Sequence, residues 1–382
     1  MPKSKLRLKI AVNICRALLA LTLLLSGFLK ANDPVGTGIK IDEYIAALGF
    51  DDAGGFPSVV VGIALAFVEL ALGAHIAVAR HRRFTSMVAV GFMGVMTLVS
   101  VWIAIDNPVS DCGCFADAIV LTNMQTLLKN IVLLAAAVCI FRWYRLQPQM
   151  SAGWSWLVVL ISMIASLLFA VRCLYMGPLI DFSPYKVGTN LTQAVLGATA
   201  DDSAGSRLQF ETKIIYRRGD ETLELDADAD DPDSTWEYVE TRSTPVGTFN
   251  ANQSNHHLDS GNFYIADPIS DEDITADVLQ QQGDVFLLIL PDMENADQGS
   301  AGNINAAYDY ALAHDIPFYC LTASDTAAQQ RWTDYTGAEY EYYRSDRQVL
   351  QTMVRSNPGL ILLTDGVIAN KWTCTQIPLF EE

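Results

Sequence analysis

The sequence predicts a bundle of five transmembrane helices followed by an α+β domain outside the membrane. Three observations support this fold class: five long apolar segments, basic residues in alternate loops, and an abrupt change of charge after residue 176. The 382 residues are 51% hydrophobic and 18% charged, yet their net charge is −18. The first 176 residues carry 14 Lys+Arg against 9 Asp+Glu, a net charge of +5, and the remainder carries 11 against 34, a net charge of −23. This division excludes one homogeneous globular domain, and the acidic half excludes a nucleic-acid binder because it would repel phosphate.

Five apolar segments are long enough to cross a bilayer, which takes about 20 helical residues. They cover residues 10–29, 57–79, 85–105, 122–141 and 154–175. The first is longer than the apolar core of a signal peptide, and Lys30 interrupts the small-residue pattern of a cleavage site. We therefore expect it to remain as a membrane helix, so that residues 1–176 form one all-α transmembrane domain.

Basic residues predict the orientation of the bundle, because Lys and Arg are enriched in loops on the cytoplasmic side. They cluster before segment one, between segments two and three, and between segments four and five: Lys3, Lys5, Arg7, Lys9, Arg80, Arg82, Arg83, Arg142 and Arg145. The alternate loops hold only Lys30 and Lys40 and are otherwise acidic. We expect the lipid bilayer of a bacterial inner membrane to hold the bundle, with the N-terminus in the cytoplasm and the acidic half in the periplasm.

Two charges within the spans need a partner, because burying a charge in hydrocarbon costs at least about 2.5 kcal/mol. Arg16 lies roughly 10 Å from the inner end of segment one, and Glu69 lies roughly 12 Å from the inner end of segment two. Because the two depths agree, we predict an intramembrane ion pair between Arg16 and Glu69.

The loop between segments three and four carries the residues best suited to chemistry, Cys112 and Cys114, in the sequence Asp111-Cys112-Gly113-Cys114-Phe115-Ala116-Asp117. Two thiols one residue apart can close a small, strained disulfide, and glycine gives the backbone the freedom that this closure needs. Strained, accessible disulfides exchange readily. Thr122-Asn123 supplies an N-cap for the next helix, whereas the two aspartates of the loop disfavour a thiolate.

Three interpretations of this loop stay open: a redox-active dithiol, a structural disulfide, and a metal site. The metal site would need two further ligands that the loop does not supply, so we expect no metal. Cys173 ends segment five on the same side of the membrane and is a candidate resolving thiol, with plain packing as the alternative. Cys15 and Cys139 lie too deep to meet the loop, and we interpret both as packing residues.

Segments one to four resemble the DoxX-like and MauE family of membrane proteins. The similarity rests on Arg16, on Ser26-Gly27-Phe28-Leu29-Lys30, on Glu69 with Gly73, and on the cysteine motif before Leu121-Thr122-Asn123-Met124. With Asp181-Phe182-Ser183-Pro184-Tyr185 after segment five, the larger pattern is similar to the DoxX/MauE-type fusion proteins of Bacteroidetes. The resemblance implies a helical bundle linked to periplasmic disulfide or quinone chemistry; MauE itself is implicated in maturing a disulfide-rich amine dehydrogenase.

Residues 177–260 are polar and strand-prone, and we interpret them as a β-rich linker or subdomain. Residues 210–218 and 221–225 alternate in polarity around Gly219-Asp220, which predicts a half-exposed hairpin. The acidic run from Asp226 to Asp233 lacks the spacing of an EF-hand loop, so a solvated loop is favoured over a calcium site, and its role is not assigned.

From residue 261 to residue 382, strands alternate with helices. We expect strands at 285–290, 317–322, 340–343, 359–364 and 367–372, and helices at 304–313, 327–335 and 348–355. A βαβ unit followed by a helix-linked hairpin resembles thioredoxin or a peroxiredoxin-like relative. The resemblance implies a cis-proline at Pro358 that faces an active dithiol. That dithiol would follow strand 285–290, where the sequence reads Pro291-Asp292-Met293-Glu294, so we expect a degenerate thioredoxin-like domain without the Cys-x-x-Cys motif.

Two functions fit these patterns. The first is a membrane thiol–disulfide oxidoreductase, or an accessory to one. In it Cys112 and Cys114 exchange with a periplasmic protein thiol client, quinone is the electron sink, and the C-terminal domain recruits the client; no covalently bound cofactor is expected. The second is a non-enzymatic membrane scaffold in which the disulfide is structural and the thioredoxin-like domain binds an envelope partner. The client, the electron acceptor and the oligomeric state are not assigned by the sequence.

Overall fold

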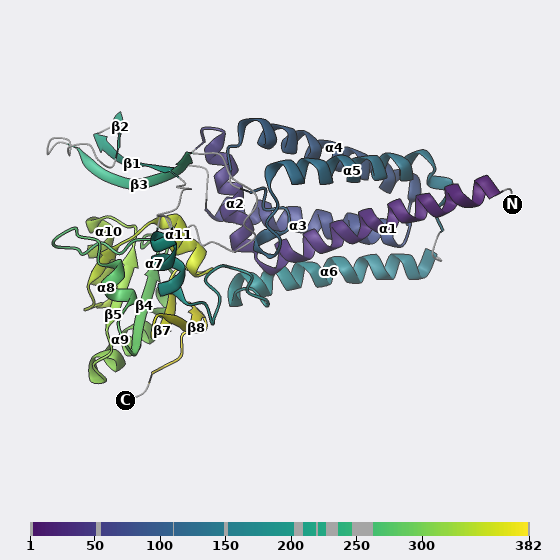
Figure 1. Cartoon of the computed structure of the whole chain (residues 1–382). Coiled ribbons are helices and arrows are strands. Elements are labelled where there is room, and N and C mark those ends of the chain that lie inside the picture. Colours follow the sequence, from purple (N-terminus) through teal and green to yellow (C-terminus); the bar gives the residue numbers. More distant parts are fainter. Residues whose placement is uncertain are drawn as a thin grey trace. The chain divides into compact units, whose positions relative to one another are not determined.

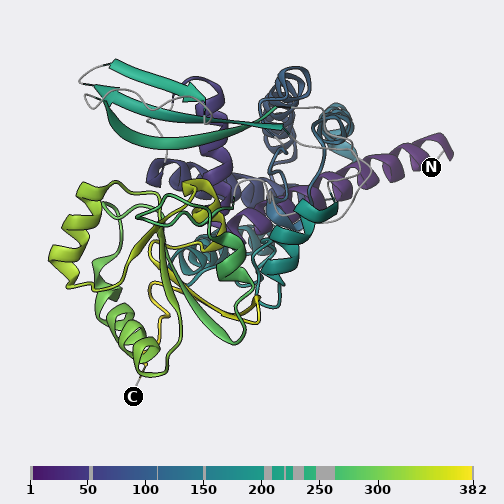
Figure 2. The same cartoon turned by 60° about the vertical axis from the view of Figure 1, so that its left-hand side comes forward.

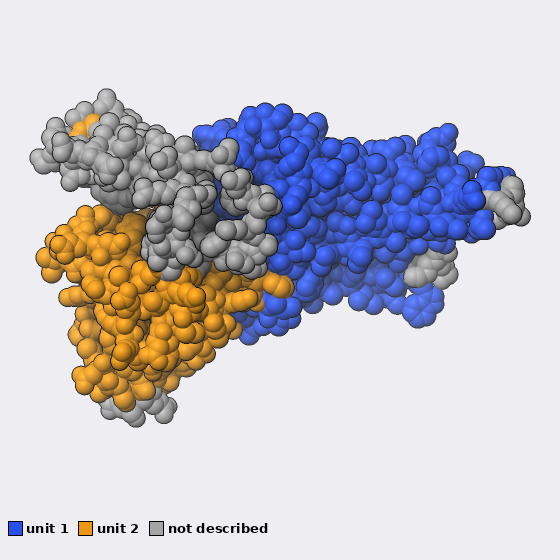
Figure 3. Space-filling model, viewed as in Figure 1, with its two compact units in different colours: residues 1–180 blue, residues 181–382 orange. Residues whose placement is uncertain are grey.

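The computed structural model describes residues 3–50, 55–109, 111–148, 152–201, 209–218, 221–226, 236–246 and 263–380. The chain divides into two compact units, Met1–Ile180 (unit 1) and Asp181–Glu382 (unit 2), which Figure 3 shows in different colours. Residues 227–233 of the acidic run lie outside the described residues, as does the boundary expected near residue 261.

Unit 1 is helical, and five of its helices are long and apolar enough to cross a membrane. They are α1 (Lys3–Asn32), α3 (Phe56–Ala77), α4 (Arg82–Asp106), α5 (Asn123–Arg142) and α6 (Ala152–Met176). Helix α1 packs against α3, α5 and α6, and α4 packs against α5 (Figure 1). The number and positions of the five predicted spans are therefore confirmed.

Small residues let α1 and α3 approach each other closely. A Cβ atom added at Gly27 would lie 2.8 Å from the Ala66 carbonyl oxygen, and one added at Gly73 would lie 2.9 Å from Leu24 Cγ. Glycine at such contacts is typical of helix pairs in membranes, where association depends on close backbone packing. The two contacts also fix the register, which places residues 27–30 of α1 level with residues 66–70 of α3.

One helix of unit 1 was not predicted. Helix α2 (Pro34–Ala47) follows α1 directly, with Asp33 as its N-cap: the Asp33 side chain accepts a hydrogen bond from the Gly36 N–H, and Pro34 occupies the first helical position. Both features are recognised N-terminal signals of a helix. Gly38 of α2 packs against Val59 in the first turn of α3. Helix α2 therefore covers the start of α3, and we call this end of the bundle, where α1 ends and α5 begins, the loop end.

Unit 2 contains an α/β domain built on a mixed five-stranded sheet. Its strand order is β6-β5-β4-β7-β8, from β4 (Asp284–Leu290), β5 (Phe318–Thr322), β6 (Tyr342–Arg344), β7 (Gly359–Thr364) and β8 (Val367–Thr373). Strands β4, β5 and β6 are parallel, whereas β7 is antiparallel to β4 and to β8. The five predicted strands of this region are confirmed, with β6 displaced by two residues at its start.

Helices cover both faces of this sheet. They are α7 (Leu191–Asp201), α8 (Thr275–Leu279), α9 (Ala301–Ala313), α10 (Thr326–Thr336) and α11 (Arg347–Met353). Alternate residues of β4 enter two separate cores: Leu287 packs in the core that α7, α8 and α11 share, and Leu288 packs in the core that α9 and α10 share. A strand buried on both faces reads as a continuous apolar run, which is why the sequence signal at 285–290 was clear. Leu191 and Val195 join the first core, so the packed domain includes residues upstream of 261.

A second, antiparallel sheet in unit 2 has the strand order β2-β1-β3 (Figure 2). It consists of β1 (Gln209–Arg218), β2 (Glu221–Asp226) and β3 (Glu237–Val246). The β1–β2 pairing confirms the predicted hairpin, and β3 pairs with the other edge of β1.

Candidate functional site

The Cys112–Cys114 loop connects α4 to α5 at the loop end of unit 1. Helix α5 begins with a capping box in which Thr122 Oγ1 accepts from the Gln125 N–H and the Gln125 side chain accepts from the Thr122 N–H, so the predicted cap is confirmed. Asn123 Nδ2 donates to Asn107 Oδ1 at 2.6 Å and to the Val109 carbonyl at 2.9 Å. The two ends of the loop are therefore tied together beside the first turn of α5.

The two thiols contact each other and are half-buried. Cys112 Sγ accepts from the Cys114 N–H at 3.2 Å and from Thr126 Oγ1 at 3.1 Å. Gly113 between them has a φ of +59°, a left-handed conformation that glycine adopts without steric cost. The backbone therefore folds both sulfur atoms toward the same side, where α5 lies.

Side chains of α1 and α2 hold the opposite, carbonyl side of the loop. Tyr44 Oη donates to the Cys112 carbonyl at 2.9 Å, and Ser26 Oγ donates to the Cys114 carbonyl at 2.7 Å. Lys40 Nζ forms ion pairs with Asp111 and Glu43, each at 3.1 Å. Both cysteine carbonyls are thus fixed by a frame of helix side chains, and the two cysteines themselves are half-buried.

A buried ion pair lies beneath the loop. Lys30 Nζ contacts the two Glu69 carboxylate oxygens at 2.9 and 3.1 Å, and it also donates to Ser26 Oγ at 2.6 Å and to the Cys114 carbonyl at 2.9 Å. Lys30 and Glu69 are only 5% and 4% exposed. A buried charge pair is stable only when further hydrogen bonds satisfy its remaining atoms, and here one of them reaches the cysteine loop itself.

The predicted Arg16–Glu69 ion pair is wrong, because Glu69 pairs with Lys30. Arg16 Nη1 instead donates to the Pro148 carbonyl at 3.2 Å, at the other end of the bundle. The α1–α3 register explains the error: Arg16 lies about 12 residues from the level of Glu69, or roughly 18 Å at the helical rise. The depth of Glu69 in the membrane cannot be counted from the first residue of α3, because α2 covers the first turns of α3.

The loop environment separates the two thiols electrostatically. A hydrogen bond from Cys112, opposed by burial and assisted by the positive charges of Lys129 and Lys30, lowers the pKa of Cys114 to about 6. The pKa of the Cys112 thiol is raised, because Cys112 donates a hydrogen bond to Cys114 and is itself buried. Sequence reasoning weighed only the two aspartates of the loop and missed these lysines, although Lys129 lies four residues after Gln125 of the capping box, on the same helix face.

The other cysteines occupy different surroundings. Cys173 is 1% exposed, and its sulfur contacts Arg172 Nη1 at 3.9 Å; among the described residues it forms no hydrogen bond with Cys112 or Cys114. Its resolving role therefore stays a prediction. Cys15 and Cys139 pack against one apolar core, as expected, and their thiols also hydrogen-bond to each other, which was not expected. In the part of the chain that the structure describes, no group of three His, Cys, Asp or Glu side chains could hold a metal ion.

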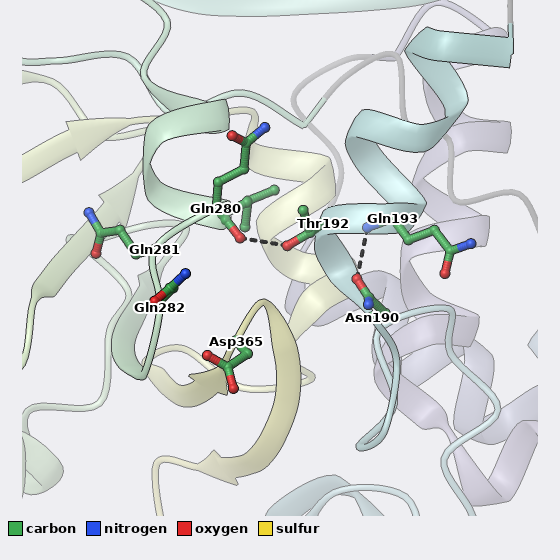
Figure 4. Close-up of a pocket in the computed structure, with 8 residues that line it drawn as sticks. Asn190, Thr192, Gln193, Gln280, Gln281, Gln282 and Asp365 are labelled. Carbon is green, nitrogen blue, oxygen red and sulfur yellow. Dashed lines mark hydrogen bonds between the residues drawn. The ribbon is translucent and has the colours of Figure 1, made fainter.

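Unit 2 offers two further candidate features. The Asn357–Pro358 peptide bond is cis, and Pro358 is buried just before β7. A pocket of about 620 Å³ lies between the start of α7 and the segment after α8, lined by Asn190, Thr192, Gln193, Leu279, Gln280, Gln281, Gln282 and Asp365 (Figure 4). Asp365 is the one carboxylate in its lining, and it accepts from the Gly283 N–H. The pocket therefore offers amide hydrogen bonds but no acid–base pair or nucleophile.

The comparisons with known proteins give a family match within unit 1. No curated protein and no solved structure matches the chain. The residues that form the Cys112–Cys114 site, including Ser26, Lys30 and Glu69, all fall within the matched region. Residues 8–144 match the family described as methylamine utilisation protein MauE, so this part of the chain is similar to that family of membrane proteins.

Proposed function

We propose that the chain is a membrane thiol–disulfide oxidoreductase, or an accessory to one, that acts through Cys112 and Cys114. The feature that carries this proposal is the contact between two half-buried thiols beside the Lys129 ammonium, an environment that lowers the pKa of Cys114 and raises that of Cys112. A dithiol of this kind exchanges with a client disulfide: one thiolate attacks, a client thiolate leaves, and the second thiol closes the Cys112–Cys114 disulfide. The client gains two electrons and two protons, and the reverse sequence oxidises a client dithiol.

The charge pattern supports a periplasmic position for this site. In the proposed orientation the basic loops face the cytoplasm, so the cysteine loop, after three crossings, and unit 2, after five, would lie on the opposite, oxidising side. Sustained exchange needs a two-electron acceptor, and a quinone dissolved in the bilayer is the acceptor that we propose. Transfer of two electrons and two protons from the dithiol would yield the disulfide and the quinol.

Unit 2 would recruit the client. Its strand order, with three parallel strands followed by two antiparallel ones, supports a thioredoxin-like domain. The segment after β4 contains no cysteine, so this domain would hold a client without exchanging with it. By analogy with the family that matches unit 1, the client would be an envelope protein whose disulfides must be formed correctly, such as an enzyme of amine utilisation.

The alternative is a non-enzymatic scaffold in which Cys112 and Cys114 form a structural disulfide. The frame that fixes both cysteine carbonyls favours this possibility, because it would also rigidify a structural loop. The reduction potential separates the two: a value well below about −300 mV indicates a structural disulfide, and a value of about −200 mV or above indicates exchange.

The direct test replaces both Cys112 and Cys114 with serine in cells and measures the redox state of periplasmic protein cysteines by thiol trapping. Exchange predicts that the client accumulates in the wrong redox state, whereas the matched Cys15→Ser/Cys139→Ser variant leaves it unchanged. An unchanged redox state in the Cys112→Ser/Cys114→Ser variant would refute the enzyme function.

A further inference from the structure

We infer that Cys114 is the attacking thiol, that Cys112 resolves the mixed disulfide, and that Lys129 is a positioning residue that keeps Cys114 ready as an anion. The inference rests on the proposed exchange function and adds a division of roles to it. Three features of the loop carry it: the kind of donor beside each sulfur, the balance of charges, and the position of Lys129.

The hydrogen bonds give the two sulfur atoms different roles. The Lys129 ammonium lies beside the Cys114 sulfur and contacts the ring of the adjacent Phe115. Cys112 Sγ instead accepts from neutral donors, the Cys114 N–H and the Thr126 hydroxyl. Because an adjacent cation stabilises a thiolate more than neutral donors do, we assign the negative charge of the reduced protein to Cys114 and the remaining proton to Cys112. When Cys112 loses that proton to the leaving client thiolate, its two neutral donors stabilise it for attack on Cys114 Sγ.

The charges around the loop leave one cation to balance the Cys114 thiolate. Lys30 is paired with Glu69, and Lys40 is paired with Glu43 and Asp111. Burial and the neighbouring acidic groups raise the pKa of Tyr44, which therefore remains a neutral donor. Lys129 forms no ion pair with any carboxylate among the described residues. Groups facing the loop from α1, α2 and α3 thus carry no net positive charge, Asp117 adds a negative charge within the loop itself, and the compensating positive charge comes from α5.

Lys129 is held in place for this role by the residue next to Cys114. Its Nζ atom lies 4.6 Å from the centroid of the Phe115 ring, a cation–π contact, and Phe115 is 7% exposed. An ammonium seated between an aromatic face and a thiolate is partly desolvated, which strengthens its attraction for the anion.

The step balances in both directions. The Cys114 thiolate attacks one sulfur of the client disulfide, that bond breaks, and the first client sulfur leaves as a thiolate that takes the Cys112 proton. Cys112 then attacks Cys114 Sγ, the mixed disulfide breaks, and the second client sulfur leaves as a thiolate that takes a proton from water. The protein ends as the Cys112–Cys114 disulfide and the client as a dithiol.

The test uses the full-length protein in phospholipid nanodiscs and glutathione disulfide as the probe, with mass spectrometry to identify the modified cysteine. In the Cys112→Ser variant, glutathione should accumulate on Cys114. In the Cys114→Ser variant, Cys112 should react at least about tenfold more slowly, because it lacks the adjacent cation. Equal rates for the two variants, or faster reaction at Cys112, would overturn the assignment.

The role of Lys129 is tested by the pH dependence of Cys114 alkylation with iodoacetamide, measured site by site. The wild-type midpoint should lie near the Cys114 pKa of about 6. Lys129→Met should raise this midpoint by about one to two pH units and slow alkylation at pH 6 about tenfold, whereas Lys129→Arg should restore it. Arg142→Met, which removes a cation at the far end of the same helix, is the matched control. A Lys129→Met midpoint equal to that of Arg142→Met would refute the inference.

These readouts do not depend on any client. If glutathione and iodoacetamide select Cys114 as expected while the Cys112→Ser/Cys114→Ser variant leaves periplasmic cysteines unchanged in cells, the proposed function fails and the assignment of the attacking thiol stands. If cellular exchange is lost in the serine variants but glutathione selects Cys112, the proposed function stands and the assignment fails.

Discussion

The Lys30–Glu69 ion pair gives the sharpest test of how unit 1 is held together. Lys30→Met would remove the cation that pairs with a carboxylate that is 4% exposed, and of the two donors that the described residues give to the Cys114 carbonyl it would leave the Ser26 hydroxyl. Breaking a buried pair by removing one partner costs about 3–5 kcal/mol in soluble proteins. We expect a loss of this size in the free energy of unfolding of unit 1.

Removing both charges should cost much less than removing one. Lys30→Met with Glu69→Leu leaves no unpaired charge, and the remaining loss is the hydrogen bonds that Lys30 gives to Ser26 and to the Cys114 carbonyl, about 1 kcal/mol each. The double variant should therefore be destabilised by about 2 kcal/mol. The two single substitutions would then be strongly non-additive.

The assay is a double-mutant cycle in mixed phospholipid–detergent micelles, with unfolding of unit 1 followed by pulse labelling of Cys173, which is 1% exposed in the folded protein. Arg16→Met combined with Glu69→Leu is the control cycle, because Arg16 bonds the Pro148 carbonyl and lies far from Glu69. Its two substitutions should add within about 0.5 kcal/mol. Additivity in the Lys30–Glu69 cycle, or coupling in the Arg16–Glu69 cycle, would show that the structure assigns the wrong cation to Glu69.

Three further predictions concern the loop. Gly113→Ala forces alanine into a left-handed conformation and places its Cβ 3.1 Å from Lys40 Cγ. The free energy of unfolding of unit 1 should therefore fall by about 1–2 kcal/mol. Gly91→Ala, whose Cβ would meet no atom within 4 Å, should be nearly neutral. Folding lowers the pKa of Cys114, so the Cys114 thiolate contributes to the free energy of unfolding of the reduced protein. This contribution should be fully present above the unfolded thiol pKa of about 8.5 and should be lost as the pH falls through about 6. In Cys114→Ser, unfolding curves at pH 5 and pH 9 should lack this difference. Tyr44→Phe removes the hydrogen bond to the Cys112 carbonyl, which stabilises the dithiol form by about 1 kcal/mol. The reduction potential of the Cys112–Cys114 disulfide should therefore fall by about 20 mV. An increase in this potential would contradict the role of the Tyr44 hydrogen bond.

The sequence predicted the architecture well because each element carries a strong local signal. The five spans are long apolar runs, and β4 is a continuous apolar strand buried on both faces. Helix α2 was missed although Asp33 and Pro34 mark its start, because its amphipathic pattern is short and follows a membrane helix directly. Local signals therefore sufficed for the elements, whereas the partners of individual charges depended on the register between helices.

The cysteine loop shows why a motif alone could not decide between structural and redox roles. The pattern Cys112-Gly113-Cys114 places two thiols within reach of each other, but their chemistry depends on residues that are distant in sequence. Lys30 from α1, Tyr44 from α2 and Lys129 from α5 meet at the loop only because α1 and α3 pack closely and α2 turns back over α3. A structural disulfide would need the frame on the carbonyl side and nothing more. The cation on the sulfur side has no such explanation, and it is the feature that favours exchange over a purely structural role.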